Sequence, residues 1–127
     1  MMVKTRELIG DQLDWAVATC EGYTDLRKNP HRFDSTLIMS PPRNEYGPVF
    51  LDDLDYSGDW SMGGPIIDRE HIDLVWHASG ELEWSAYGDI GAADDNVQRD
   101  PHPLIAAMRC YCCAKLGDEI EIPEELL

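Results

Sequence analysis

The chain has 127 residues, and its 25 acidic and 10 basic side chains give a formal net charge of −15 at pH 7. This length predicts a single domain over residues 1–127, because a second hydrophobic core would be too small to be stable. The charge opposes binding to phosphate backbones and to anionic membrane surfaces, so we expect neither direct nucleic-acid binding nor membrane binding.

The N-terminal residues and the cysteines predict a cytoplasmic protein. Charged residues appear as early as Lys4, and no apolar run of about seven or more follows, which argues against a signal peptide. No stretch approaches the roughly 18 consecutive apolar residues of a membrane span. Cys110, Cys112 and Cys113 are too close in sequence to pair comfortably with one another, and Cys20 stands alone.

In the first third of the chain the pattern predicts two strands and a helix. Residues 3–5 have the character of a short strand, and a helix is expected from Thr5 to Cys20, where apolar residues recur at helical spacing. The segment 23–29 is polar and predicts a surface connection. Residues 36–39 then predict a short strand that ends before two prolines.

The middle of the chain predicts a hairpin. Apolar residues alternate with a mixed face over 72–78 and with polar residues over 81–86, and a two-residue turn at 79–80 separates the two runs. Trp76 and Trp84 fall on the apolar side of their strands, so we expect them to approach one another across the pair. Core packing is the expected role of both, and the alternative is that the aromatic pair lines a pocket at a sheet edge.

The last third predicts a loop, a helix and a strand. Residues 89–99 show no period and predict an irregular loop. A helix is expected over 104–116, after a proline-rich start and before Gly117, and residues 120–122 predict a final strand. Together the elements predict an α+β fold, with a small, mainly antiparallel twisted sheet and two helices packed on one of its faces.

Residues Tyr56 to Glu70 differ from the rest of the chain. Glycines, a proline and a tryptophan occur together there, a composition that predicts a shaped loop and neither a helix nor a strand. A loop of this kind is suited to binding, since tryptophan offers a flat surface, glycine backbone allows close approach and arginine offsets negative charge. We therefore predict a ligand-binding site made by Tyr56, Asp59, Trp60, Gly63, Gly64, Pro65 and Arg69. The competing interpretation is that Trp60 fills the core and Arg69 pairs with nearby acids.

No pattern in the sequence predicts catalysis, a metal or a cofactor. The Cys110–Cys113 group has no second, matching C-x-x-C pair, and the four histidines have no partner at ligand spacing. The acidic run at residues 52–55 lacks the ligand order of a calcium loop. The serines lack a nucleophile motif, and the glycines at 58–64 form neither a P-loop nor a dinucleotide fingerprint. We expect a protein that is not an enzyme.

Three blocks of sequence carry a resemblance that spans nearly the whole chain. They are Val-Lys-Thr-Arg-Glu-Leu with Leu-Asp-Trp-Ala-Val-Ala, then Asp-Trp-Ser-Met-Gly-Gly-Pro-Ile-Ile-Asp-Arg-Glu, and finally Pro-Leu-Ile-Ala-Ala-Met-Arg-Cys-Tyr with Lys-Leu-Gly-Asp-Glu-Ile-Glu-Ile-Pro. In these blocks the chain resembles the NinX-like family of small phage and prophage proteins. The resemblance implies a phage or prophage origin and a compact α+β domain, and with that origin the expected location is the cytoplasm of the host cell. It supplies no catalytic residues.

Two functional hypotheses follow. The first is a non-enzymatic phage accessory protein with an anti-defence role, which binds a small polar, nucleotide-like ligand at residues 56–69; oligomerisation of the chain would complete its pocket. The second is an acidic protein inhibitor that mimics nucleic acid and binds a basic host protein. In the second case the acidic side chains would matter and Trp60 would be structural. These acids are Asp52, Asp53, Asp55, Asp94, Asp95, Glu124 and Glu125.

Overall fold

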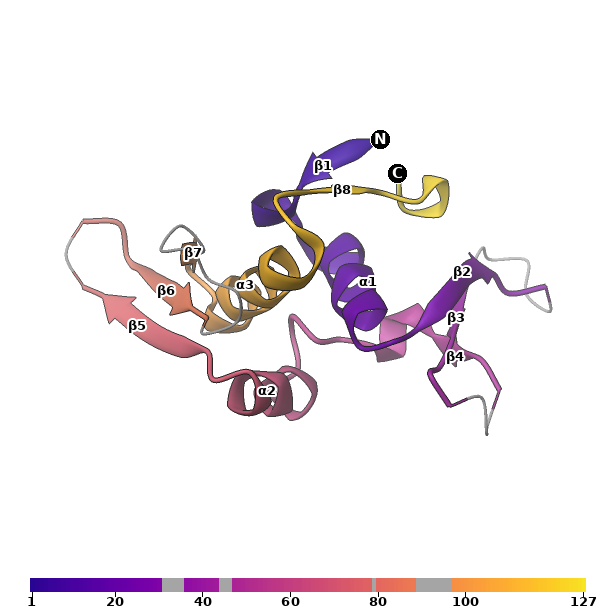
Figure 1. Cartoon of the computed structure of the whole chain (residues 1–127), viewed down its shortest axis with the longest axis horizontal. Coiled ribbons are helices and arrows are strands. Elements are labelled where there is room, and N and C mark those ends of the chain that lie inside the picture. Colours follow the sequence, from indigo (N-terminus) through magenta and orange to yellow (C-terminus); the bar gives the residue numbers. More distant parts are fainter. Residues whose placement is uncertain (31–35, 44–46, 79, 89–96) are drawn as a thin grey trace.

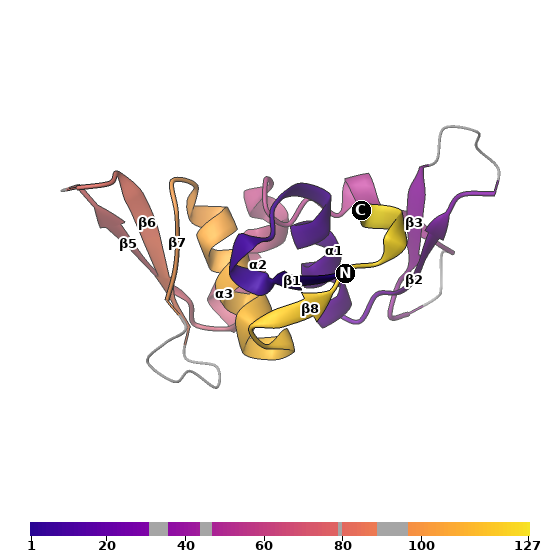
Figure 2. The same ribbon diagram turned by 90° about the horizontal axis from the view of Figure 1, so that it is seen from above.

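A computed structural model describes residues 1–30, 36–43, 47–78, 80–88 and 97–127. Its helices lie at the centre, and two three-stranded sheets lie at opposite ends of the long axis of the molecule (Figures 1 and 2). The helices are α1 (Gly10–Cys20), α2 (Trp60–Arg69) and α3 (Pro103–Leu116). The strands are β1 (Met2–Lys4), β2 (Thr24–Lys28), β3 (Leu37–Ser40), β4 (Val49–Phe50), β5 (Asp73–His77), β6 (Glu83–Tyr87), β7 (Val97–Asp100) and β8 (Glu119–Glu121). Short 3-10 helices are η1 (Thr5–Glu7), η2 (Leu51–Asp53) and η3 (Glu124–Leu126).

The predicted α+β class is confirmed, but the strands do not form the one sheet predicted. They form three small antiparallel sheets, ordered β1-β8, β2-β3-β4 and β5-β6-β7. Two of these sheets join strands that are neighbours in sequence, and α1 and α2 separate the sheets along the chain. The third pairs the two ends of the described chain, where Val3 faces Ile120 (Figure 1). The helices therefore form a layer between sheets, and α2 adds a third helix to the two predicted.

Helix α3 organises the core, and its prediction is confirmed to within one residue. Pro103 occupies the first turn, where a missing N–H costs nothing, and Gly117 ends the helix with a φ of +87°. The helix contacts α1, α2, β6 and β7. Ala106 and Ala107 are fully buried, and their small side chains let neighbouring elements approach closely. A central helix of this kind is buried on most of its faces.

The first helix begins later than predicted. Residues 5–7 form η1, and α1 starts only at Gly10, which adopts a φ of +60°. The preceding Ile9 has extended backbone, so the helix cannot run continuously from Thr5. Leu13 and Val17 lie on the predicted apolar stripe and are fully buried, and each such side chain contributes about 1.5–3 kcal/mol through burial.

The hairpin prediction is confirmed, although its aromatic pair is more exposed than expected. Trp76 of β5 lies opposite Trp84 of β6, with ring centroids 5.5 Å apart. The Trp76 side chain is nevertheless 46% exposed. The hairpin extends outward from the helical layer, so α3 covers only part of its inner face (Figure 2). The Ser79 position of the predicted turn lies outside the described residues.

Two polar segments predicted as irregular are strands. The 23–29 connection contains β2, and residues 97–99 of the predicted 89–99 loop belong to β7. Both strands lie at an edge of their sheet, where one side of the backbone is unpaired and polar side chains are favoured. Neither therefore shows the apolar alternation that would identify a strand. The rest of that loop, residues 89–96, lies outside the described residues.

Candidate functional site

The segment predicted as a binding loop is a short turn followed by α2. Asp59 is the N-cap of this helix: its Oδ1 accepts hydrogen bonds from the Ser61 backbone N–H at 2.9 Å and from the Ser61 hydroxyl at 2.7 Å. These bonds hold the pKa of Asp59 below its ordinary value. Such a cap stabilises the helix, which offsets part of the cost of two glycines and Pro65 in a ten-residue helix. The loop prediction is thus wrong over residues 60–69.

Two of the predicted site residues belong to the interior. Tyr56 is 6% exposed, and burial raises the pKa of its phenol. Gly63 is also buried, and a Cβ there would lie 2.6 Å from the Tyr56 carbonyl oxygen and 2.7 Å from Leu104 Cδ2. The absence of a side chain at Gly63 is what allows α2 to pack against the start of α3. Gly64 is half-buried with open space at its Cβ position, and Pro65 is exposed.

Arg69 lies at the opposite end of α2 from Trp60, about 13 Å away along the axis at 1.5 Å per residue. Its guanidinium makes a two-point contact with Glu21, at 2.9 and 2.8 Å. The same Glu21 accepts a hydrogen bond from the buried Tyr111 hydroxyl at 2.7 Å. This Glu21–Arg69–Tyr111 cluster joins the ends of α1 and α2 to α3. The structure therefore does not bring Arg69 and Trp60 together around one small molecule.

Unlike the buried Tyr56 and Gly63, Trp60 lies at the surface, with 54% of its surface exposed. It borders a groove of about 320 Å³ between the N-terminal ends of α2 and α3. We call this the Trp60 groove; its lining residues are Ser57, Gly58, Trp60, His102, Pro103, Leu104 and Ile105. Of the seven predicted site residues, Trp60 alone is among these lining residues, and Asp59 adjoins it in sequence. The contribution from residues 102–105 was missed, although the Asp-Pro-His-Pro sequence marked the start of a helix there.

Asp14 supports the turn that carries the groove. This side chain of α1 accepts a hydrogen bond from the Ser57 N–H at 2.9 Å and is 7% exposed. Burial raises the pKa of Asp14 from 3.8 to about 6, despite the opposing effect of the hydrogen bonds from Ser57. The charge of Asp14 therefore destabilises the folded state.

This shift predicts a pH dependence of stability. The pKa of Asp14 is higher in the folded state than in the unfolded state, so the protonated side chain favours folding. This contribution to stability is fully present below about pH 4 and is lost as pH rises through 6. A difference of this size between the folded and unfolded pKa of Asp14 corresponds to at most about 3 kcal/mol in the free energy of unfolding. In urea unfolding, Asp14→Asn should gain stability relative to wild type by up to that amount between pH 4 and pH 7. Asp73→Asn, an exposed change on β5, should not gain stability in this way, and equal pH profiles for the two variants would contradict this assignment.

Within the described residues, no group of three or more His, Cys, Asp or Glu side chains is placed to hold a metal ion. All four cysteines are free thiols. Of the helices described, none is long and apolar enough to cross a membrane.

The fold and the groove define a small, acidic α+β protein with an exposed tryptophan beside an open concavity. The chain belongs to the family described as "Bacteriophage P22, NinX", whose model matches residues 4–115. It is therefore a phage protein, as the resemblance in its three sequence blocks predicted. A comparison with curated proteins finds no match.

Proposed function

We propose that this phage accessory protein is a non-enzymatic binding protein that captures a small polar, nucleotide-like ligand in the Trp60 groove. The observation that carries the proposal is the 54% exposure of Trp60 at the edge of a concavity of about 320 Å³. A tryptophan left half exposed by folding offers a ready stacking surface. Stacking of a base on an aromatic side chain typically contributes about 1–3 kcal/mol.

The N-terminus of α3 supplies the second half of the proposed site. The first-turn amides of a helix have no partner within the helix, and the macrodipole adds partial positive charge there. His102, the N-cap of α3, makes no side-chain capping hydrogen bond, whereas the N-terminus of α2 is capped by Asp59. We therefore expect a phosphate or similar group of the ligand at α3, beside Leu104 and Ile105, and its base against Trp60. Gly58 lines the groove between them.

The net charge of −15 opposes an anionic ligand at long range. At physiological ionic strength, however, charges farther than about 8 Å are largely screened. Groups inside the groove then decide affinity, and we expect binding to be weakest at low salt. An anti-defence role, in which the protein removes a nucleotide signal of host defence, agrees with the phage origin of the family.

The proposal is tested by titrating nucleotides against protein in which the indole N–H signals of the four tryptophans are followed by NMR. We expect a nucleotide to shift the Trp60 signal, and Trp60→Ala to weaken binding at least tenfold, the equivalent of about 1.4 kcal/mol. Trp76→Ala is the matched control, because Trp76 is similarly exposed at 46% but lies on the hairpin and does not line the groove. Equal losses in the two variants would contradict the proposal.

A second candidate function is favoured by the acidic exterior. Asp52, Asp53, Asp55, Glu124 and Glu125 are all exposed, whereas Asp94 and Asp95 lie outside the described residues. Such a surface suits a basic groove on a host nucleic-acid-handling protein. Changing the exposed acids to amides should abolish this activity and leave ligand capture intact, while Trp60→Ala should do the reverse.

A further inference from the structure

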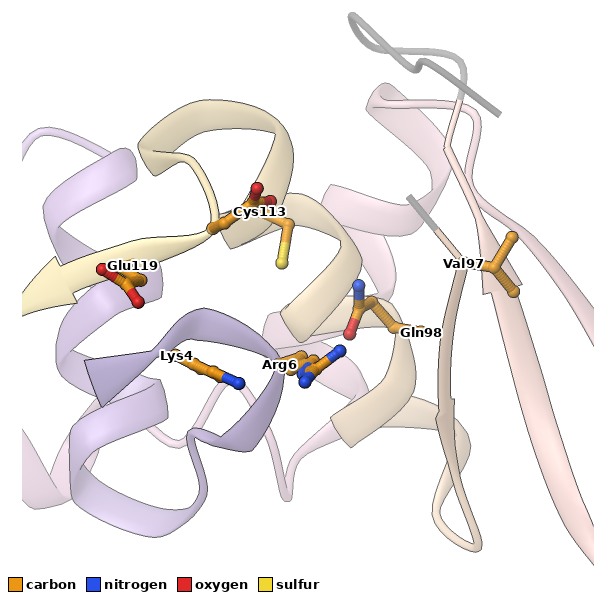
Figure 3. Close-up of a pocket in the computed structure, with 7 residues that line it drawn as sticks. Lys4, Arg6, Val97, Gln98, Cys113 and Glu119 are labelled. Carbon is orange, nitrogen blue, oxygen red and sulfur yellow. The ribbon is translucent and has the colours of Figure 1, made fainter. Parts of the chain in front are cut away.

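A second pocket lies at the other end of α3. It has a volume of about 370 Å³ and is formed by the β1–η1 segment, β7 and the residues around the end of α3. Lys4 and Arg6 extend into it from one side, with Gln98 opposite and the Cys113 thiol pointing in from the helix (Figure 3). Because Cys113 follows Ile105 of the Trp60 groove by eight residues, the two sites are separated by about 12 Å along α3. We call this second site the Lys4–Arg6 pocket.

The two cations in this pocket differ from most arginines in the described part of the chain. Four arginines pair with carboxylates, namely Arg27, Arg69, Arg99 and Arg109. Among the residues described, no carboxylate lies within ion-pair distance of either Lys4 or Arg6. Within the described residues, the two cations therefore share one pocket without a direct ion pair, although the protein has a charge of −15. Placing like charges together costs free energy that nearby opposite charge offsets, and a bound anion in direct contact would offset more of it.

The backbone that carries these cations is fixed in place. Thr5, between them, is fully buried; its N–H donates to the Asp118 carbonyl at 2.8 Å and its hydroxyl donates to the Gly117 carbonyl at 2.6 Å. On the N-terminal side, Lys4 pairs in register with Glu119 of β8. Anchoring of this kind fixes the backbone from which both exposed side chains extend before any ligand binds. It reduces the entropy lost on binding.

The lining residues also indicate the chemistry of the ligand. Arg6 can form paired hydrogen bonds to phosphate oxygens, and Lys4 adds a point charge. Asp118 and Glu119 line the same pocket, so the four charged side chains sum to zero. A ligand of high negative charge would be repelled, whereas the carboxylates can accept hydrogen bonds from hydroxyl groups. We propose that the Lys4–Arg6 pocket binds a small hydroxylated phosphomonoester of the sugar phosphate class.

The test is calorimetric titration of the full chain with ribose 5-phosphate, with free ribose as the second probe. We expect ribose 5-phosphate to bind and ribose not to bind. The double variant K4Q/R6Q should lose affinity at least tenfold. The matched control K28Q/R43Q removes two exposed cations outside the pocket, and it should bind as wild type does. Trp60→Ala should also bind normally, which separates this site from the proposed function.

Alkylation of Cys113 provides a readout on the wild-type protein. Burial, with Asp118 nearby, raises the pKa of this thiol to about 11, so labelling is run at alkaline pH. Ribose 5-phosphate should slow modification of Cys113 and leave that of Cys20, which is outside the pocket, unchanged. The proposal is overturned if wild type does not bind ribose 5-phosphate, if K4Q/R6Q and K28Q/R43Q lose affinity equally, or if Cys113 is not protected.

Discussion

Gly63→Ala should destabilise the protein by about 1–3 kcal/mol, the usual cost of forcing an extra methyl into a packed interior. The new Cβ would lie 2.6 Å from the Tyr56 carbonyl oxygen, and backbone cannot yield as a flexible side chain can. Either α2 moves away from α3 or the turn before α2 is displaced. The expected result in urea unfolding, followed by tryptophan fluorescence, is a lower midpoint with an unchanged slope.

Gly64→Ala provides the matched control. It introduces the same methyl group one residue further along α2, where nothing lies within 4 Å of the new atom. Alanine is favoured over glycine in a helix by up to about 1 kcal/mol, so this variant should be slightly stabilised. Similar destabilisation by both changes would show that the packing of α2 has been misassigned.

The second large effect is expected at the Glu21–Arg69–Tyr111 cluster. Burial of the Glu21 carboxylate disfavours its ionised form, but hydrogen bonds from Arg69 and Tyr111 outweigh this and hold its pKa below the ordinary value. Arg69→Ala would leave that partly buried charge with one remaining hydrogen bond. We expect a loss of about 1–3 kcal/mol in the free energy of unfolding.

A double-mutant cycle separates this loss from general effects of substitution. Glu21→Gln removes the charge that Arg69→Ala strands, so the double variant should lose less stability than the sum of the two single changes. Arg27→Ala, which breaks an exposed pair with Asp25, should cost no more than about 1 kcal/mol. Strict additivity at Glu21 and Arg69 would show that the two side chains are not coupled.

Elements with strong local signals could be predicted from the sequence. The α3 stripe, which includes Leu104, Met108 and Cys112, lies between a proline and Gly117, and both limits agree with the structure. The hairpin was predicted because alternation with period two over 72–86 distinguishes a strand from a helix. In both cases local preference and tertiary packing favour the same conformation.

Helix α2 could not be predicted in this way because its composition and its packing conflict. Gly63, Gly64 and Pro65 disfavour a helix, yet burial of Ile66 and the Asp59 cap stabilise one. Met62 and Ile66, four residues apart after a capping residue, were the signal that was overlooked. The division into three sheets depends on contacts between distant segments, which no local pattern encodes.

The candidate site was predictable only in part, for a related reason. Trp60 was identified from its residue type, and its exposure agrees with a binding role. The residues that complete the groove come from 102–105, more than 40 positions later, and only the fold brings them beside Trp60. Arg69 is grouped with Trp60 in the prediction because it offers positive charge within the same segment. A helix holds the two apart.

The most direct test of ligand capture in the Trp60 groove is mass spectrometry of small molecules released from the purified protein after incubation with an extract of infected cells. Wild type and Trp76→Ala should both release the same nucleotide-like compound, and Trp60→Ala should release little or none. Release of no such compound from wild type, or of equal amounts from Trp60→Ala, would contradict the proposed function.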